Sequence, residues 1–272
     1  MSAQIIAVCN QKGGVGKTTV TAGLTEVLAH RLGKRVLLVD VDPQFNATSN
    51  MGISGPEFTL NDVLAGGEGN DVIPGVMADA AVPAGVDWQA DAAKGQEWPV
   101  VHLVAAERAL AGREQDQMMG REHRLRVALD GATEAYDIVL LDCPPSLGQL
   151  TINALVAAHS ALLVTEPRAS SVEGLSEIVK TLGSVRSLFN PGLSLAGIIV
   201  NRVSKRKSDQ AEWIEKLEAD YGPQLLPPYL PEREAFAKAN SAAVPLHNYG
   251  PNGRELLDRL EEIARTITKE ED

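Results

Sequence analysis

Eight residues near the amino terminus constrain this chain more than any other feature. Residues 12–19 read KGGVGKTT, between a short apolar run and a segment with helical spacing. Glycines let a backbone curl so that consecutive N–H groups point at phosphate oxygens. The strict pattern GxxxxGK[ST] is not met, because its first position is Gln11; the loop instead carries a second lysine, Lys12, ahead of Lys17. The loop therefore predicts a site for a nucleoside triphosphate.

Different side chains of the loop are expected to bind different parts of that ligand. The Lys17 ammonium can reach the β- and γ-phosphates, and the Thr18 hydroxyl is placed to coordinate Mg²⁺. The helix that follows directs its positive end at the same anion. The residues predicted to bind the nucleotide here are Lys12, Gly13, Gly14, Val15, Gly16, Lys17, Thr18 and Thr19.

The flanks of the loop predict the local fold. Ile5–Cys9 form a continuous apolar run, as expected of a strand buried on both faces. Apolar residues then recur at helical spacing as far as Leu32, and Gly33 is a natural helix stop. A second buried strand, RVLLVD, ends at Asp40. The order is strand, loop, helix, strand, so a ligand should sit at the carboxyl ends of the strands.

The same alternation continues along the chain. Further apolar runs are Val100–Val104, Ile138–Leu141, Ala161–Val164 and Ile198–Val200. Helical stretches are expected at about 106–135, 147–158, 173–189 and 207–221. This pattern predicts the α/β class, with one P-loop NTPase domain over residues 1–272 and a mostly parallel, twisted sheet with helices on both faces.

Residues 66–100 interrupt the pattern. They contain several glycines and prolines, two of the three tryptophans, and six acidic residues against one lysine. A loop of this length in a compact domain is usually functional or disordered. A surface excursion without a specific role is the alternative, and the sequence leaves the choice open.

Composition excludes several classes of protein. The hydrophobic content is 44%, no run approaches the length of a membrane span, and the first strand starts so near Met1 that we expect no signal peptide or separate DNA-binding domain before it. Cys9 and Cys143 lack metal-ligand spacing, and we expect buried thiols in a reducing cytoplasm. The net charge of −11 excludes a uniformly basic surface, so any contact with nucleic acid must use a local patch.

Carboxylates follow two other strands. Asp42 stands just beyond the second strand, where it can face the γ-phosphate and hold a water or Mg²⁺, whereas Asp40 can instead cap or brace this turn. Asp142 ends the apolar run in YDIVLLDCPPSLG, which has the form of a Walker B element whose carboxylate holds Mg²⁺ opposite Thr18. The Pro- and Gly-containing turn after it suits a nucleotide-sensitive switch.

Three segments together resemble one family. NQKGGVGKTT, LLVDVDPQFNATS and YDIVLLDCPPSLG are similar to the successive motifs of the ParA family of deviant Walker-A ATPases, which segregate plasmids and chromosomes. The resemblance runs through nearly the whole chain, including VNRV at 200–203 and the tail from Leu230, and is weakest over 66–100 and 110–125. It implies an ATPase with ATP and Mg²⁺ as cofactors, in the small form without an added DNA-binding domain.

The resemblance also implies residue roles and partners. Lys12 matches the signature lysine that reaches the partner's nucleotide in an ATP-sandwiched homodimer, Lys17 matches the P-loop lysine, and Asp42 matches the aspartate that supports water attack. Thr18 and Asp142 match the Mg²⁺ ligands. The residues that fall where the family lines its adenine pocket are Asn201, Pro231 and Arg233. The implied partners are non-specific DNA and a ParB-like centromere-binding protein, and the implied location is the cytoplasm, on the nucleoid.

A short basic cluster is the candidate DNA contact. It consists of Arg202, Lys205, Arg206 and Lys207, which could hold phosphates without reading bases. A solvated loop before a helix is the alternative. The tail reads LPEREAFAKA where many chromosomal relatives carry an arginine-bearing IPRxVR-like stretch, so this chain resembles small plasmid-type members and the position of its DNA contacts stays open.

Three other functions compete with DNA segregation. A metabolic P-loop ligase or synthetase would show rapid, substrate-dependent turnover. A MinD-like positioning ATPase would end in a basic amphipathic helix at a lipid surface, but the apolar stripe in RELLDRLEEIARTITKEED faces a mixed and finally acidic side, so we assign it to the core and expect no membrane contact. A reductase-like switch with an iron–sulfur cluster would need more cysteines than Cys143 near an interface.

Overall fold

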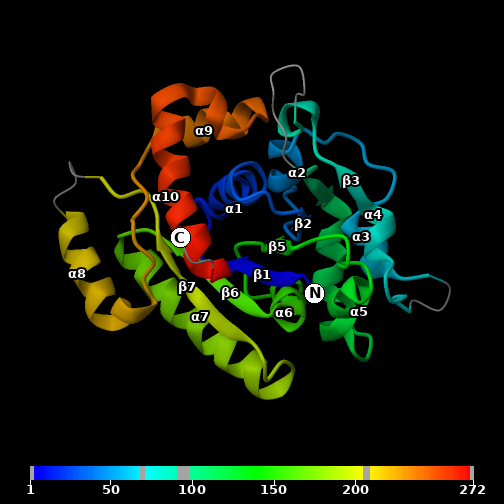
Figure 1. The fold of residues 1–272 in the computed structure, drawn as a ribbon. Coiled ribbons are helices and arrows are strands. Elements are labelled where there is room, and N and C mark those ends of the chain that lie inside the picture. Colours follow the sequence, from blue (N-terminus) through cyan, green and yellow to red (C-terminus); the bar gives the residue numbers. More distant parts are fainter. Residues whose placement is uncertain (1–2, 68–70, 91–98, 205–208, 270–272) are drawn as a thin grey trace.

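A computed structural model describes residues 3–67, 71–90, 99–204 and 209–269. These residues form a seven-stranded sheet in the order β3-β4-β2-β5-β1-β6-β7 (Figure 1). The strands are β1 (Gln4–Cys9), β2 (Val36–Asp40), β3 (Ala81–Pro83), β4 (His102–Val104), β5 (Ile138–Asp142), β6 (Ser160–Thr165) and β7 (Ser194–Val200). All neighbouring pairs are parallel except β3 with β4, so the predicted mostly parallel sheet is confirmed.

Helices connect the strands. They are α1 (Lys17–Glu26), α2 (Asn46–Asn50), α3 (Leu60–Ala65), α4 (Met77–Ala80), α5 (Arg124–Leu129), α6 (Gln149–Ala157), α7 (Ala169–Leu188), α8 (Asp209–Tyr221), α9 (Glu234–Ala242) and α10 (Gly250–Thr268). A π-helical turn, Val27–Arg31, continues α1, and a 3₁₀ turn, Leu246–Tyr249, precedes α10.

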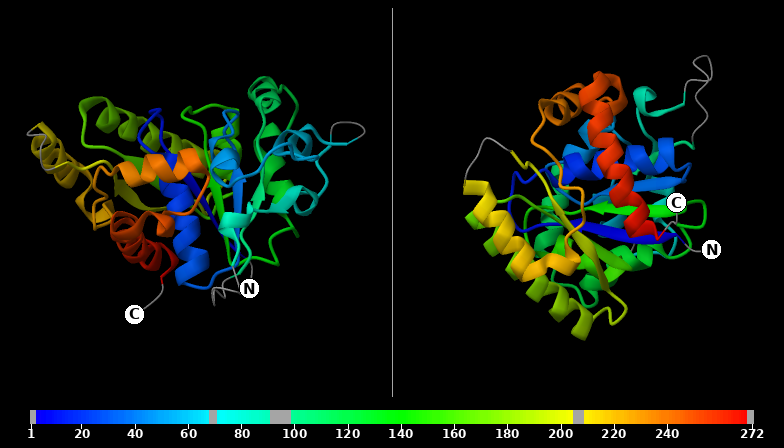
Figure 2. Two further views of the ribbon diagram at one scale, coloured as in Figure 1. Left: turned by 90° about the horizontal axis from the view of Figure 1, so that it is seen from above. Right: turned by 60° about the vertical axis from the view of Figure 1, so that its left-hand side comes forward.

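The core lies on both faces of the sheet, because successive strand residues point to opposite sides. In β1, Ile6 and Val8 join a cluster with α1, α9 and α10, whereas Ile5 and Ala7 join a second cluster with α3, α5, α6 and α7. Figure 1 shows α1, α9 and α10 on one side of the sheet and α6 and α7 on the other. In Figure 2, α8 lies beside α7 at the β7 edge of the sheet.

Two segments differ from the sequence-based expectations. The continuous helix expected over 106–135 is wrong: the chain forms 3₁₀ segments at Arg108–Gln115 and Arg121–His123 and only then α5. Gly120 and Gly131 bracket α5 with φ of 76° and 82°, conformations that end a helix. The region 66–100 is not only a surface loop, because β3 pairs antiparallel with β4 and closes one edge of the sheet.

The fold brings the glycine-rich loop and both strands that end near carboxylates to one edge of the sheet. Strands β2, β5 and β1 are neighbours, and Asp142 lies in register with both Asp40 and Val8. The carboxyl ends of these three strands therefore lie side by side. The P-loop follows β1, Asp42 follows β2, and Asp142 is the last residue of β5. This is the edge at which open α/β sheets bind ligands.

Candidate nucleotide-binding site

The P-loop has the open backbone that its glycines predict. Gly14 and Gly16 have φ of 85° and 89°, in the left-handed region that favours glycine. A Cβ on Gly16 would lie 2.5 Å from Asn201 Nδ2, whereas a Cβ on Gly14 would meet nothing within 4 Å. The carbonyl oxygen of Val15 accepts a hydrogen bond of 2.9 Å from Asn201 Nδ2, which fixes the loop from behind. The loop is thus held open, with Gly14 facing free space.

Two hydroxyls of α1 hold the carboxylate of Asp142. Thr18 Oγ1 donates to Asp142 Oδ2 at 2.7 Å, and Thr21 Oγ1 lies 2.9 Å from Asp142 Oδ1. Burial raises the pKa of Asp142 to about 6, and the Thr18 hydrogen bond and the charge of Lys17 oppose that rise. A hydroxyl and a carboxylate facing each other beneath a phosphate cradle are the oxygen ligands that Mg²⁺ prefers.

Asp40 and Asp42 have different surroundings. Asp40 is fully buried, and its carboxylate accepts from the Thr48 N–H and Oγ1, both at 2.8 Å, and from the Asp42 N–H at 3.1 Å. Burial, together with the charge of Asp142, raises the pKa of Asp40 to about 8. Asp42 instead lines the cavity over the P-loop, and its Oδ1 accepts the Gln44 N–H at 2.9 Å. Asp40 therefore braces the turn, whereas Asp42 lies on the wall of the cavity over the P-loop.

Two cavities share the P-loop wall. The first, of about 450 Å³, contains the glycines of the loop together with Lys17, Thr18 and Asp42. The second, of about 720 Å³, extends along the tail residues 231–241. The residues common to both cavities are Gly16, Thr19, Arg202, Asn240 and Ser241. The two cavities therefore adjoin each other at the P-loop.

The predicted adenine residues lie in the second cavity. Asn201, Pro231 and Arg233 all line it. The Arg233 guanidinium also pairs with Glu255, with Nη2 to Oε2 at 3.0 Å. Asn240 Nδ2 donates to Thr19 Oγ1 at 2.6 Å and so joins the tail to the P-loop helix. The structure thus brings these three residues next to the P-loop, and their contact with adenine stays a prediction.

Lys12 points away from this cavity. Its Nζ is hydrogen-bonded to Ser170 Oγ at the start of α7, and its N–H donates to Asn10 Oδ1 at 2.8 Å. Lys12 does not line the phosphate cavity, unlike Lys17. The two lysines of the motif therefore face different directions.

The basic cluster is only partly described. Lys205, Arg206 and Lys207 lie outside the described residues. Arg202 has a φ of 56° and lines both cavities, which is a position for contact with the nucleotide. Its assignment to DNA binding stays a prediction, as does that of the other three.

Features tied to the competing functions are buried. The thiols of Cys9 and Cys143 are free and buried, with their Sγ atoms 3.1 Å apart, as expected of structural thiols. The apolar stripe of α10 packs into the core; its buried members are Leu256, Leu257, Leu260, Ile263, Ala264 and Ile267. Within the described ranges, none of the helices is long and apolar enough to cross a bilayer.

The residues present fit ATP with Mg²⁺. Gly14 leaves open space where a Cβ would stand, Lys17 is buried next to it, and the Thr18–Asp142 pair lies below. Lysine and backbone N–H groups suit the phosphates, and the hydroxyl–carboxylate pair suits a hard cation.

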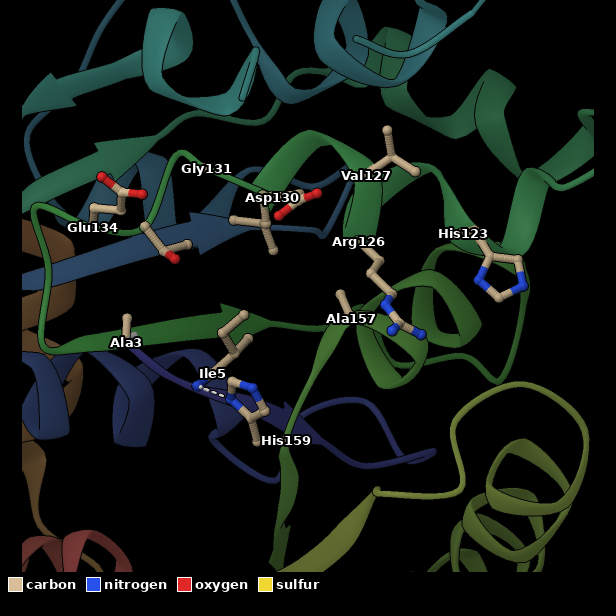
Figure 3. Close-up of a pocket in the computed structure, with 12 residues that line it drawn as sticks. Ala3, Ile5, His123, Arg126, Val127, Asp130, Gly131, Glu134, Ala157 and His159 are labelled. Atoms are coloured by element: carbon tan, nitrogen blue, oxygen red, sulfur yellow. Dashed lines mark hydrogen bonds between the residues drawn. The ribbon is translucent and has the colours of Figure 1, made fainter. Parts of the chain in front are cut away.

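A third cavity, of about 580 Å³, lies at the opposite edge of the sheet (Figure 3). It is formed at the amino ends of β1 and β6 and before β5. Figure 3 shows His123 and Arg126 towards one end and Glu134 towards the other, with the His159 ring accepting the Ile5 N–H at 2.9 Å. Neither the P-loop nor the strand-end carboxylates reach it.

Sequence reasoning missed several residues of the site. Thr21 lies one helical turn after Thr18, and that spacing was a usable signal for a second hydroxyl on Asp142. Asn240 carried no signal, because it joins Thr19 across more than two hundred residues of chain.

This geometry defines a class of protein. A glycine-rich loop with two lysines after β1, an aspartate after β2 and a buried aspartate ending β5 are the site of a P-loop nucleoside triphosphatase of the deviant Walker-A type.

Comparisons with known proteins place the chain within that class. The model of the AAA domain family matches residues 3–195. The chain is 36% identical over 267 residues to the chromosome-partitioning ATPase Soj of Thermus thermophilus, covering 97% of this chain and 96% of that one. The chain therefore belongs to the ParA/Soj family of P-loop ATPases.

Two solved structures show the same fold. One is cobyrinic acid a,c-diamide synthase from Mycobacterium smegmatis with bound ADP and magnesium, which is 29% identical, with a TM-score of 0.72 and coverage of 93% of this chain and 98% of that one. The other is a Cyanothece McdA–ATP complex, with a TM-score of 0.81, 21% identity and coverage of 100% and 98%. The second likeness concerns the fold alone.

Proposed function

We propose that this protein is an ATP-driven DNA-partitioning switch. ATP and Mg²⁺ bind at the P-loop edge of the sheet, the ATP-bound chains form a sandwich homodimer that binds DNA without sequence preference, and slow hydrolysis releases the DNA. A ParB-like centromere-binding protein stimulates the hydrolysis. The family and its Soj relative support this function, and residues 1–272 act as one ATPase domain.

The described contacts support distinct roles in hydrolysis. Lys17 neutralises charge on the β- and γ-phosphates, and Thr18 and Asp142, 2.7 Å apart, hold the cation. A Mg²⁺ ion held there would offset the negative charge that develops on the phosphate oxygens. Asp42 faces the same cavity and positions the attacking water. Phosphoryl transfer needs positioning and charge neutralisation more than a strong base.

The single observation that carries the proposal is the direction of Lys12. Its side chain contacts Ser170 on α7 and does not line the phosphate cavity of its own chain, although it stands at the start of the P-loop. A lysine held outward beside the nucleotide can reach a ligand on a second copy. This favours a dimer closed by ATP over an ATPase that works alone.

Electrostatics limit how DNA can be bound. The net charge of −11 means that most of the surface repels phosphates. Binding must therefore use a patch, with Arg202, Lys205, Arg206 and Lys207 as candidates, and must weaken as salt rises. A second copy doubles the patch, so affinity depends on dimerisation. We place this activity in the cytoplasm, on the nucleoid.

The test is binding of a random-sequence DNA duplex with ATP, ADP or no nucleotide, at two salt concentrations, with molecular mass followed in parallel. We expect binding only with ATP, by a species of twice the chain mass, and strongly weakened at the higher salt. A matched Lys12→Ala variant should bind ATP and remain a monomer. An ATP-dependent dimer that ignores DNA at both salt concentrations would overturn the DNA-partitioning proposal.

A second candidate, an ATP-dependent synthetase, is favoured by one observation. The structure 29% identical to this chain is a cobyrinic acid a,c-diamide synthase. Such an enzyme would hydrolyse ATP rapidly only with a carboxylic acid substrate and an ammonia donor. Turnover that rises with these compounds and not with DNA would favour it. A MinD-like positioning role would instead require binding to lipid vesicles, which the buried stripe of α10 argues against.

A further inference from the structure

A cluster of potential metal ligands lies away from the nucleotide site. It consists of Glu26 at the end of α1, His30 in the π-helical turn and His247 in the 3₁₀ turn Leu246–Tyr249. One donor atom from each side chain lies within 4.8 Å of the other two. His247 Nδ1 donates a hydrogen bond of 3.0 Å to Glu26 Oε1, and a metal ion between these two atoms would take the place of that proton.

Local structure explains why these three side chains meet. Residues four apart on a helix share a face, and Glu26 and His30 have this spacing at the junction of α1 and the π-helical turn. Single π-helical turns within helices are frequent at functional sites. On the other side, Gly253 of α10 allows the 3₁₀ turn to lie close, since a Cβ there would be 2.0 Å from the Leu246 carbonyl oxygen. The ligands thus stand on packed elements rather than on an open loop.

We propose that Glu26, His30 and His247 form a binding site for a divalent transition metal, with Zn²⁺ as the preferred ion. Two imidazoles and a carboxylate are a zinc donor set that leaves a fourth position for water. Adjacent ligand atoms around tetrahedral zinc are about 3.3 Å apart. Glu26 Oε1 and His247 Nδ1 already have nearly that spacing. The other pairs of ligand atoms lie within 4.8 Å, so zinc binding would shorten each of those distances by at most about 1.5 Å.

Hydrogen bonds from neighbouring groups orient these three side chains, as is usual for metal ligands in proteins. The carbonyl oxygen of Trp88 can only accept, so His30 Nε2, 3.3 Å away, carries the proton and the lone pair lies on Nδ1. Backbone N–H groups orient both carboxylate oxygens of Glu26: Oε2 accepts the Leu246 N–H at 2.6 Å, and Oε1 accepts the His247 N–H at 3.0 Å. The His247 side chain retains 33% exposure, which gives an ion a way in, whereas Glu26 is buried.

The location suggests what the ion would do. It would join α1, which begins at the P-loop, to the 3₁₀ turn that follows α9, and α9 carries Asn240, the residue bonded to Thr19. Zinc would therefore link α1, the helix after the P-loop, to the carboxyl-terminal segment that lines the second cavity. The binding itself depends on neither ATP nor DNA, so it can be tested whatever the outcome for the proposed function.

The experiment uses the full chain without an affinity tag, stripped with a chelator and returned to buffer with excess Mg²⁺ so that the P-loop site does not take up zinc. ZnCl₂ is then titrated against a fluorescent chelator, and melting is followed with and without zinc. We expect one zinc per chain and a higher melting temperature. His30→Gln and His247→Gln should each weaken binding at least about tenfold, because even outer-shell changes cost that much.

Matched controls decide between explanations. His123→Gln, at the opposite edge of the sheet, should bind zinc as the wild type does. Circular dichroism checks folding, and His247→Gln is the safer variant because that side chain is partly exposed. The proposal would be overturned if His247→Gln bound zinc as tightly as the wild type. It would also be overturned if Cys9→Ser lost zinc binding while both histidine variants kept it. In that case Glu26 serves only to hold the N–H groups of the 3₁₀ turn.

Discussion

The two edges of the parallel sheet differ in chemistry although each has a large cavity. At the carboxyl edge, α1 and α6 begin, and cavities of about 450 and 720 Å³ surround the P-loop. At the amino edge, α5 and α6 end beside a cavity of about 580 Å³. Helix amino ends attract anions and helix carboxyl ends repel them. Cavity volume therefore does not locate a nucleotide site in this fold, whereas the direction of the strands and helices does.

The charged residues follow the same division. At the amino edge, the Arg126 guanidinium suits the negative ends of the helices beside it, and Asp130 and Glu134 lie in the same cavity. At the carboxyl edge, Lys17 and the loop N–H groups face a cavity whose acidic residue is Asp42. Substitutions at the two edges should therefore separate activity from stability.

The largest difference is expected between two aspartates, one at each edge. Asp42→Ala should leave ATP affinity within a few-fold and lower turnover by about 100-fold or more, because it removes a group that positions the attacking water. Asp130→Ala, on an exposed residue of the amino-edge cavity, should leave both unchanged. Phosphate release and binding of a fluorescent ATP analogue measure the two quantities. Unreduced turnover in Asp42→Ala would refute its role.

A smaller effect should separate two buried threonines on α1. Thr21 Oγ1 lies 2.9 Å from Asp142 Oδ1, whereas Thr25 Oγ1 donates to the Thr21 carbonyl oxygen at 2.9 Å, and both side chains are fully buried. Thr21→Val should raise the Mg²⁺ concentration needed for half-maximal ATPase activity about tenfold, because it frees a carboxylate oxygen of the metal ligand. Thr25→Val should leave that concentration unchanged. Equal Mg²⁺ dependence of the two variants would show that Thr21 does not orient Asp142.

Much of the site could be predicted because it follows local patterns. The P-loop, Asp42 and Asp142 each stand next to a strand whose apolar run is readable, and parallel strands bring their ends to one edge. The short strand β3 was not predicted, because an edge strand of three residues with Pro83 at its end lacks a periodic pattern.

The unpredicted parts depend on distant contacts. The continuous helix expected over 106–135 is interrupted at Gly120, which adopts a positive φ. Trp88, within the segment 66–100, packs into the core cluster of α1, α9 and α10, and its Nε1 donates to the Asn50 carbonyl oxygen at 3.1 Å. The pair Thr19–Asn240 and the cluster around Glu26 join residues far apart in sequence, and no single-sequence pattern reports such contacts.

The smallest effect is expected at the amino edge, where Arg35 and Asp137 pair just before β2 and β5. Arg35 Nη2 lies 2.7 Å from Asp137 Oδ1, and the Arg35 N–H donates to Oδ2 at 2.8 Å. The hydrogen bonds from Arg35 lower the pKa of Asp137 to about 2 from its ordinary 3.8. A depressed carboxyl pKa gives stability above the unfolded pKa, and that stability is lost as pH falls from about 4 towards 2.

Asp137→Asn should therefore lower the melting temperature slightly at neutral pH, since the pair is largely exposed and screened by solvent. The difference from the wild type should shrink as pH falls below about 4 and vanish near 2, whereas ATPase activity at neutral pH should not change. Thermal melts over this pH range test the prediction. A difference that persists at the acid end would mean that Asp137 stabilises the strand ends through its geometry rather than its charge, and a loss of ATPase activity would mean that the two edges of the sheet are coupled.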